Sequence, residues 1–590
     1  MADPSAERLA ALRAELAVRG LAGFVVPLTD EHMSEYVGEY AQRLRWLTGF
    51  EGSAGAAVVM RERAAMFTDG RYTLQVRAQV DGALYDYQEV PVTSPAAWLG
   101  AEAGAGQKIG FDPWLHSRGW VRDASARLAA RGAELVAVTD NPVDAVWTDR
   151  PAPSAVPMEV HELRFAGRTS ADKRAEMAGW LKARGADALV VTALDSIAWL
   201  LNVRGRDVAR TPVALAFAVL QADASLDLFM APEKLSDAVR AHLGADVRCH
   251  GREAFAGFLA GLGGQRVVAD PVGAVAAVFD ALEAGGAVLV EARDPCVLAK
   301  AVKNEVEIAG TRAAHLRDGA ALTRFLHWLS GTDGVDELTA SDRLHDFRKE
   351  TGCLEDLSFD TISGAGPNGA VVHYRASAAT NRRLEPGSLY LVDSGGQYRD
   401  GTTDVTRTLA IGVPDAEMRD RYTRVLKGHV ALACAVFPAG TRGGQLDVLA
   451  RHALWAAGLD YAHGTGHGVG SYLAVHEGPQ RIATAGSDEV LLPGMILSDE
   501  PGYYKTGAWG IRIENLVLVA RREMPGAERA MLGFETLTLA PYERALIDVA
   551  LLEPGERAWV DAYHARVMAA LGPLLEGPAR AWLVEMTRPL

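Results

Sequence analysis

Five residues in the C-terminal half of the sequence have the types and spacing of a metal-binding set: Asp393, Asp404, His467, Glu500 and Glu514. Four carboxylates and one imidazole form an oxygen-rich set that suits hard or borderline divalent cations better than a thiolate-bound zinc ion. Two such cations that share carboxylates can activate one water molecule for hydrolysis. The sequence therefore predicts a dinuclear metallohydrolase.

Each of the five residues lies in a short motif. Asp393 closes an apolar run, where a turn-forming aspartate is the alternative interpretation. Thr402, Asp404 and Thr406 alternate with the residues between them, so Asp404 is expected to point to one face of a strand, where a charge needs a partner or a metal. The motifs are Leu391-Val-Asp-Ser-Gly, Gly401-Thr-Thr-Asp-Val-Thr-Arg, His463-Gly-Thr-Gly-His-Gly-Val-Gly, Ser498-Asp-Glu-Pro-Gly and Gly510-Ile-Arg-Ile-Glu-Asn.

The remaining motifs are weaker when taken singly. His463 and His467 are separated by a segment with two glycines and no following glutamate, which predicts a glycine-rich loop and excludes a helical HExxH zinc motif. Glu500 is expected at a strand-to-turn boundary before Pro501. Arg512 and Glu514 are expected on one face of a strand, where a solvated ion pair is the alternative. Their joint occurrence in this order makes coincidence improbable.

These motifs need a scaffold of short strands and Gly-rich turns between helices. Apolar periodicity predicts one helix over about Ala299–Leu329, another over about Ala416–Phe437, and a helical tail over Pro554–Leu590.

Two earlier segments repeat one plan, in which a helix and a Gly cap precede a short β-branched run. The first runs through Arg19-Gly20 to Phe24-Val-Val26, and the second through Arg184-Gly185 to Leu189-Val-Val191. Pro-rich breaks follow at Thr148–Pro157 and around Asp294-Pro-Cys296. The sequence therefore predicts two similar α/β domains, 1–152 and 153–296, followed by an α+β catalytic domain, 297–590.

The bulk composition excludes several classes of partner. The chain has 590 residues and a net charge of −15, with no run of Lys or Arg, so we expect no nucleic-acid partner. No apolar stretch reaches the roughly 20 residues of a membrane span, so we expect no membrane partner. The start lacks the pattern of a secretory signal and the four cysteines are scattered, which predicts reduced thiols and a cytoplasmic location.

Two stretches, His463–Pro479 and Asp400–Thr408, resemble the pita-bread metallopeptidases, in particular the three-domain cytosolic aminopeptidase P family. Further matches are Gly49–Gly55, Trp147–Pro151 and Val191–Trp199, so the resemblance covers the whole chain. It implies two N-terminal domains of the creatinase type before a pita-bread catalytic domain. It also implies removal of the N-terminal residue from peptides with proline second, through a water or hydroxide held between two divalent ions.

The resemblance also assigns roles to individual residues. Asp393 would bind one ion, His467 and Glu500 the other, and Asp404 and Glu514 both. The metal would be two divalent ions per chain, with Mn(II) as the family-like choice. Three histidines, His373, His463 and His476, would orient the substrate, stabilise the oxyanion and move protons. Arg512 would hold Glu514 in place. Two residues of the first domain, Glu35 and Arg71, would reach the mouth of the cleft, although a surface ion pair is the alternative for both.

Three other functions stay open at this point. A prolidase would cleave only Xaa-Pro dipeptides on the same catalytic fold. A non-catalytic pita-bread binding protein would be expected to lack the five ligands. A creatinase-like hydrolase without metal fits poorly for the same reason. The resemblance further implies a homodimer formed through the catalytic domain.

Overall fold

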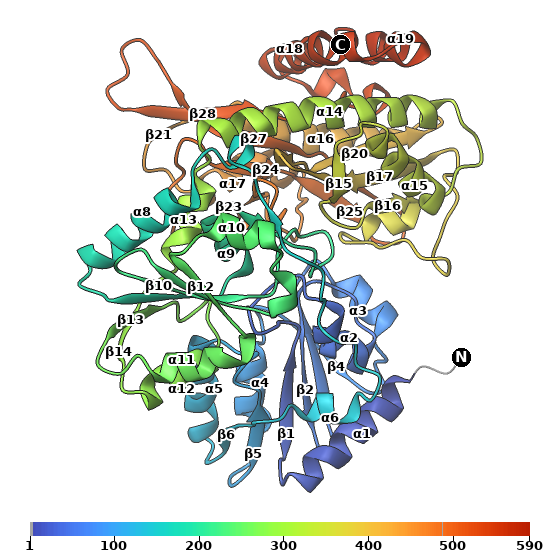
Figure 1. The fold of residues 1–590 in the computed structure, drawn as a ribbon. Helices are drawn as coiled ribbons and strands as arrows, with labels where there is room; N and C mark the ends of the chain where they lie inside the picture. The colour runs from blue at the N-terminus through green and yellow to red at the C-terminus, as the bar shows by residue number, and fades with distance from the viewer. Residues whose placement is uncertain (1–3, 486–487) are drawn as a thin grey trace. The chain divides into compact units, whose positions relative to one another are not determined.

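The structure is a computed structural model that describes residues 4–485 and 488–590. The chain folds into two compact units. The first comprises the described residues up to Leu163 together with Arg168–Val297, and the second comprises Arg164–Gly167 with Leu298–Leu590 (Figure 1).

The first unit contains two six-stranded sheets with one topology. Their strand orders are β4-β3-β2-β1-β5-β6 and β12-β11-β10-β8-β13-β14. In each sheet the central strand, β1 or β8, pairs antiparallel with one neighbour and parallel with the other. The predicted repetition of one α/β plan is therefore confirmed. The strands are β1 Gly23–Pro27, β2 Ala56–Met60, β3 Ala64–Thr68, β4 Asp86–Glu89, β5 Lys108–Phe111 and β6 Glu134–Ala137, then β8 Ala188–Val191, β10 Phe217–Gln221, β11 Leu226–Phe229, β12 Val247–His250, β13 Arg266–Ala269 and β14 Val288–Glu291.

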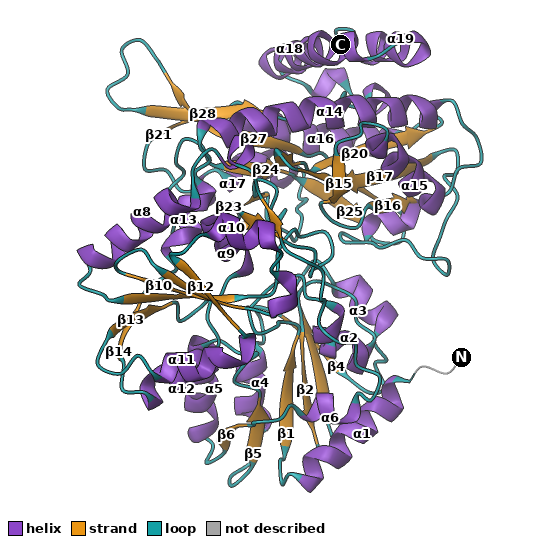
Figure 2. Cartoon of the chain, in the orientation of Figure 1, coloured by secondary structure: helices purple, strands orange, loops and turns teal. Residues whose placement is uncertain are grey.

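Each sheet buries both faces against helices (Figure 2). In β1 the side chains of Phe24 and Val26 pack with Leu12 of α1 in one cluster. Val25 packs in a second cluster with Leu99 of α4. This alternation is the period of two expected for a strand covered on both sides. The helices of this unit include α1 Ser5–Val18, α4 Pro95–Glu102, α5 Arg118–Ala129, α8 Ser170–Ala183, α9 Leu194–Leu201, α11 Phe255–Ala260 and α12 Ala276–Ala284.

The segment predicted as the first linker, Thr148–Pro157, contains no helix or strand. Both sheets lie in the same compact unit, so the boundary between residues 152 and 153 stays a prediction.

The second unit combines four sheets with a set of longer helices. Its strands are β15 Leu354–Leu357, β16 Ile362–Ala365, β17 Ser388–Ser394, β18 Gly396–Tyr398, β19 Gly401–Thr402, β20 Val405–Ile411, β21 Val436–Pro438, β22 Gly466–Gly468, β23 Glu477–Ile482, β24 Ile496–Asp499, β25 Gly502–Lys505, β26 Trp509–Arg512, β27 Asn515–Arg522 and β28 Met531–Thr536. The largest sheet has the order β21-β28-β27-β24-β22-β23, and a smaller one has the order β16-β17-β20.

The helix predicted over Ala299–Leu329 is two helices, α13 (Pro295–Ala301) and α14 (Glu305–Ser330). The prediction was wrong at Asn304, whose side chain accepts hydrogen bonds from the N–H groups of Val306 and Glu307, while the Glu307 side chain bonds back to Asn304. This capping box starts a new helix inside a run whose apolar periodicity continues across it.

The helix predicted over Ala416–Phe437 ends earlier, because α16 spans Ala416–Ala433. The following residues Val436–Pro438 pair with β28 as strand β21. The predicted C-terminal tail is confirmed as helical, in α18 (Pro554–Leu571) and α19 (Gly577–Met586).

Both tail helices pack against α14, as Figure 1 shows at the red end of the chain. Val567, Leu571 and Leu583 join the main core cluster of this unit, together with Leu426 of α16. The tail is therefore part of the core of the second unit. None of the helices in the described part of the chain has both the length and the apolar composition that crossing a membrane requires.

Candidate functional site

Asp404 and Glu514 occupy two short interruptions between strands. Thr403 and Asp404 separate β19 from β20, and Ile513 and Glu514 separate β26 from β27. The prediction that both carboxylates lie within strands was therefore wrong. The backbone leaves the regular ladder at these points, so these side chains do not follow its simple alternation. Both residues are buried, with Asp404 4% and Glu514 1% exposed.

Strand register brings Asp393 to the same place. In the antiparallel pair β17–β20, Asp393 lies opposite Thr406. The Thr406 hydroxyl donates a 2.7 Å hydrogen bond to Glu514 Oε2, and the Glu514 N–H donates to the Thr406 carbonyl at 3.2 Å. Thr406 therefore links the strand beside Asp393 to the interruption that carries Glu514.

His467 and Glu500 approach from a second pair of strands. His467 lies on β22, so the prediction of a loop at this residue was wrong. Its N–H donates to Ser498 Oγ at 2.9 Å, and Ser498 Oγ donates to Glu500 Oε1 at 3.3 Å. Glu500 follows the last residue of β24 directly, at the strand-to-turn boundary that the sequence predicts.

The imidazole of His467 has a defined orientation. Its Nδ1 lies 2.9 Å from the carbonyl oxygen of Gly468, which can only accept, so Nδ1 carries the proton. Nε2 then presents its lone pair toward Asp404 Oδ2 and Glu500 Oε1, both at 3.6 Å. This is the tautomer that a metal-binding imidazole adopts when its other nitrogen donates to a carbonyl.

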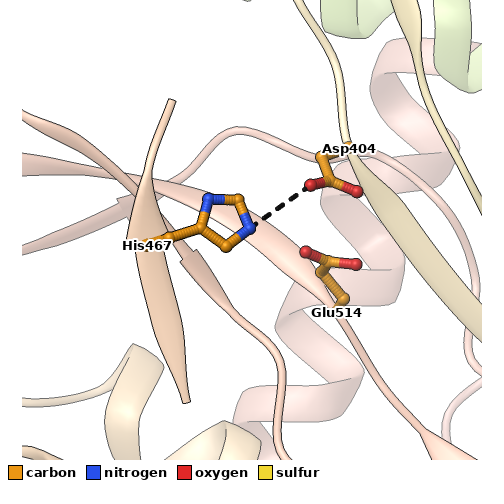
Figure 3. Close-up of side chains that lie close together, drawn as sticks. All are labelled: Asp404, His467 and Glu514. Atoms are coloured by element: carbon orange, nitrogen blue, oxygen red, sulfur yellow. Dashed lines mark ion pairs between the residues drawn. The ribbon is translucent and has the colours of Figure 1, made fainter. Parts of the chain in front are cut away.

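Figure 3 shows Asp404, His467 and Glu514 converging on one point. One ligand atom from each of the three lies within 4.8 Å of the others. The five residues predicted from sequence thus come from separate motifs to neighbouring positions in one unit.

Burial and mutual repulsion oppose ionisation of Asp404, Glu500 and Glu514. Burial, followed by the charges of Asp393 and Glu500, raises the pKa of Asp404 well above its ordinary value. Burial, followed by Asp404 and Asp393, does the same for Glu514. Burial raises the pKa of Glu500 to about 7. Adjacent buried carboxylates without enough cations are the electrostatic signature of a cation site.

Two buried carboxylate oxygens that lack a hydrogen-bond partner in the described part of the chain indicate whether this set of residues fits divalent ions. Asp393 Oδ1 and Glu514 Oε1 are buried, and no described residue forms a hydrogen bond with either. Buried carboxylate oxygens are normally satisfied. Oxygen donors left open beside the lone pair of His467 fit divalent ions such as Mn(II), which accept mixed carboxylate and imidazole ligands.

Arg512 contacts a different carboxylate from the one predicted. Its Nη2 donates to Asp393 Oδ2 at 2.5 Å, so its ion-pair partner is Asp393, not Glu514. It reaches Glu514 only through Thr406, to whose hydroxyl its Nε donates at 3.2 Å. The prediction placed Arg512 correctly at the site but chose the wrong partner, because side-chain alternation cannot show which strand lies across the sheet.

His463 lies beside a tyrosine that sequence reasoning missed. His463 Nε2 is 2.8 Å from the Tyr504 hydroxyl, and Arg512 Nη1 donates to that hydroxyl at 2.7 Å. Burial raises the pKa of Tyr504 to about 12, so the hydroxyl keeps its proton. No spacing rule marks a tyrosine on a short strand; its closeness in sequence to Glu500 was the only signal.

The other two histidines also border the site. The ring of His476 packs edge-on against His467, with 4.4 Å between centroids. His373 lies in a turn after the short helix η4 (Gly366–Ala370). Its neighbour Val372 accepts a 3.3 Å hydrogen bond from Arg512 Nη1 through its carbonyl.

Glu35 and Arg71 belong to the other compact unit. Arg71 forms a two-pronged ion pair with Asp69, with contacts of 2.9 and 2.7 Å. Glu35 accepts a 2.9 Å hydrogen bond from the Ser53 hydroxyl, which also lies 2.8 Å from the Tyr72 hydroxyl. The ion pair of Arg71 is of the kind that the alternative interpretation expects.

Comparisons with known proteins cover nearly the whole chain. Residues 309–521 match Metallopeptidase family M24, and residues 530–590 match the C-terminal region of peptidase M24. Residues 8–146 and 149–307 each match the Creatinase/Prolidase N-terminal domain.

A probable Xaa-Pro aminopeptidase P of Talaromyces stipitatus is 40% identical over 609 residues, which cover 99% of this chain and 92% of that protein. The structure of an X-prolyl aminopeptidase from Caenorhabditis elegans, a cytosolic enzyme with a di-nuclear active site, superposes with a TM-score of 0.95. It is 35% identical and covers 99% of this chain and 100% of its own. A prolidase from Pyrococcus horikoshii, 23% identical over 63% of this chain with a TM-score of 0.50, shares the fold alone.

Proposed function

This chain belongs to metallopeptidase family M24, among the Xaa-Pro aminopeptidase P proteins, and we propose that it removes the N-terminal residue from peptides with proline in second position. It has the family's fold, with two creatinase-type N-terminal segments before a pita-bread catalytic domain. The observation that carries the proposal is the convergence of Asp404, His467 and Glu514 from separate strands, with Asp393 and Glu500 beside them.

We assign the five residues to two divalent ions. Asp393 would hold one ion, His467 and Glu500 would hold the other, and Asp404 and Glu514 would contribute to both. The central position of Asp404 supports this division, since the charges of Asp393 and Glu500 both act on it. When bound, two such ions supply Lewis acidity and lower the pKa of a water molecule that they share.

The chain's own residues position the site and move protons. Arg512 holds Asp393 on one side and donates to Tyr504 on the other. Because the Tyr504 oxygen already accepts from Arg512, its proton is available to His463 Nε2. We assign His463 and His476 to proton transfer and to stabilising the oxyanion, and His373 to orienting the substrate.

A proline in second position demands a specialised site. The Xaa-Pro bond is a tertiary amide whose nitrogen carries no hydrogen, so peptidases that grip that N–H cannot use it. A site for this bond needs a Lewis acid on the carbonyl and donors for the oxyanion that do not depend on the scissile nitrogen. The metal-binding carboxylates and the flanking histidines are suited to these two tasks.

Five finer points belong to this proposal. The two ions are Mn(II), which the mixed carboxylate and imidazole ligands support. The protein works in the cytoplasm, for which the cytosolic relative from Caenorhabditis elegans is the support. It forms a homodimer through its catalytic domain, as the family resemblance implies. Glu35 and Arg71 are proposed to bind substrate at the mouth of the cleft. The domain boundaries lie near residues 152 and 296; the family ranges 8–146 and 149–307 support the first of them.

One experiment tests the reaction and the metals together. The purified protein is analysed for bound metal and assayed with Xaa-Pro-Xaa, Xaa-Pro and Xaa-Ala-Xaa peptides. We expect two ions per chain, release of the first residue from Xaa-Pro-Xaa, and little cleavage of the other two. Efficient cleavage of Xaa-Pro with poor cleavage of Xaa-Pro-Xaa would establish a prolidase instead. Binding without turnover would favour the non-catalytic binding protein.

A further inference from the structure

A buried histidine lies behind the metal site and contacts the chain neighbours of two proposed ligands. His429, on α16, is fully buried. Its Nδ1 lies 3.1 Å from the Asp499 carbonyl oxygen and 3.2 Å from Asp499 Oδ2. Its Nε2 lies 3.1 Å from Asn515 Nδ2. Asp499 directly precedes Glu500, and Asn515 directly follows Glu514.

These two neighbours are themselves paired. Asp499 and Asn515 face each other at the end of the β24–β27 ladder. This pair is the last of the ladder, and Glu500 and Glu514 lie just beyond it. His429 therefore joins the two strands at the last point before their metal-binding residues diverge.

The hydrogen-bond directions in this network are determined by one arginine. Arg407 Nη2 lies 2.9 Å from the side chain of Asn515, and a guanidinium can only donate, so the facing atom is Asn515 Oδ1. The amide nitrogen of Asn515 then faces His429 Nε2, which must accept. The Asp499 carbonyl on the other side can only accept, so His429 Nδ1 carries the proton. His429 Nε2 also lies 2.9 Å from the Tyr542 hydroxyl, which can donate to it, so each polar contact of the imidazole pairs a donor with an acceptor.

Arg407 connects the network to the other interruption. It is fully buried, and its Nη1 donates to the carbonyl oxygens of Glu514 at 2.7 Å and Thr406 at 2.8 Å. Among the described residues Arg407 has hydrogen bonds to carbonyls, an amide and a hydroxyl, and no carboxylate within ion-pair distance. A buried cation held only by neutral acceptors is costly in a core whose role is packing alone.

We propose that His429, Asn515 and Arg407 form a positioning layer that fixes the spacing between Glu500 and Glu514 and thereby determines how tightly the site holds its divalent ions. This inference rests on the proposed metal assignment. None of the three residues is assigned a contact with the metal ions or the substrate. They act through the backbone of the residues that carry the ligands, as outer-shell partners of metal sites commonly do.

The test uses the full chain, freed of metal by a chelator and titrated with Mn²⁺ alone by calorimetry. Replacing His429→Leu removes the hydrogen bonds of the imidazole to Asp499, Asn515 and Tyr542, whereas His429→Asn leaves a side chain of similar reach that can still donate toward Asp499. We expect the Leu variant to bind Mn²⁺ roughly 10–100-fold more weakly, the range for losing an outer-shell partner. The Asn variant is expected to lie between it and the wild type.

His564 provides the matched control. It is also a fully buried histidine of this unit, and its Nε2 accepts a 3.1 Å hydrogen bond from the N–H of Tyr542, a residue that contacts His429 as well. Within the described part of the chain it forms no hydrogen bond with Asp499 or Asn515, so His564→Leu is expected to lower the melting temperature while leaving Mn²⁺ affinity unchanged.

The outcomes separate this inference from the proposed function. If the wild type binds fewer than two ions or fails to cleave Xaa-Pro-Xaa peptides, the proposed function fails first. If the wild type binds two ions and cleaves, but both His429 variants bind Mn²⁺ as tightly as it does, the positioning layer is refuted. Equal weakening by His564→Leu would also refute it, because the effect would then be one of general packing. If His429→Leu does not fold, His429→Asn decides.

Discussion

Asp404 and Glu514 are the second residues of two matching interruptions, each two residues long and each between consecutive strands. Their carboxylates point toward each other (Figure 3). Thr406 holds the two interruptions together, since its carbonyl accepts from the Glu514 N–H and its hydroxyl donates to the Glu514 carboxylate. Two acidic groups are thus held near each other although the charge of Asp404 raises the pKa of Glu514, an arrangement that a shared cation would stabilise.

Replacing either carboxylate by its amide should therefore weaken metal binding but stabilise the metal-free protein. We expect Asp404→Asn and Glu514→Gln each to lose bound metal and activity, because a neutral amide is a poor ligand for a hard divalent cation. The same variants should melt at a higher temperature than the wild type when both are metal-free, because the repulsion is relieved. Metal analysis and melting curves in chelator measure the two effects. Retention of two ions per chain by either variant would contradict the proposed ligand set.

The sequence could predict the five site residues because each lies in a motif whose composition is unusual for its local element. An acid after a buried run, as at Asp393, or a histidine among glycines, as at His467, signals chemistry before the fold is known. It could not predict the interruptions at Asp404 and Glu514, because their flanking residues still alternate like a continuous strand. The partner of Arg512 was missed for another reason: cross-strand neighbours depend on register, which no local pattern reports.

His463 and Tyr504 should behave as one functional pair. We expect His463→Ala to keep its metal while kcat falls by roughly 10²–10⁴, the range for losing a positioned proton donor or acceptor. Tyr504→Phe should also lower kcat. The double variant should have a kcat no lower than that of the less active single variant, because both changes remove the same 2.8 Å contact.

Tyr503→Phe, on the same strand, is the control and should leave kcat unchanged. Metal content and turnover are measured on all variants. If His463→Ala sheds metal while His467→Ala retains it, the roles of the two histidines are reversed.

The contact between Gly510 and Gly369 should tolerate no side chain. A Cβ at Gly510 would lie 1.8 Å from the Gly369 carbonyl oxygen, so β26 would have to move away from η4. We expect Gly510→Ala to lower the free energy of unfolding by at least the 1–3 kcal/mol typical of overpacking. Gly555→Ala, where no atom lies within 4 Å of the added Cβ, is the control and should change stability little. Denaturant unfolding of both variants measures the difference, and equal stability would show that the backbone yields there.

The acid cluster should make metal binding and stability depend on pH in a defined direction. In the metal-free protein the pKa of Glu500 is about 7, raised from an ordinary value of 4.5 chiefly by burial. For a folded-state pKa that is raised, the stabilising contribution is complete below about pH 4.5 and is lost as the pH rises through about 7. Asp404 and Glu514, whose pKa values are raised further, extend the loss to higher pH. We therefore expect the metal-free protein to melt at a lower temperature at pH 8 than at pH 6.

Divalent ions need the ionised carboxylates, so the increase in melting temperature caused by Mn²⁺ should be larger at pH 8 than at pH 6. Glu500→Gln should reduce the change in melting temperature that the metal-free protein shows between pH 5 and 7. A melting temperature that stays constant from pH 5 to 8 without metal would show that these carboxyl groups do not share a proton-retaining cluster.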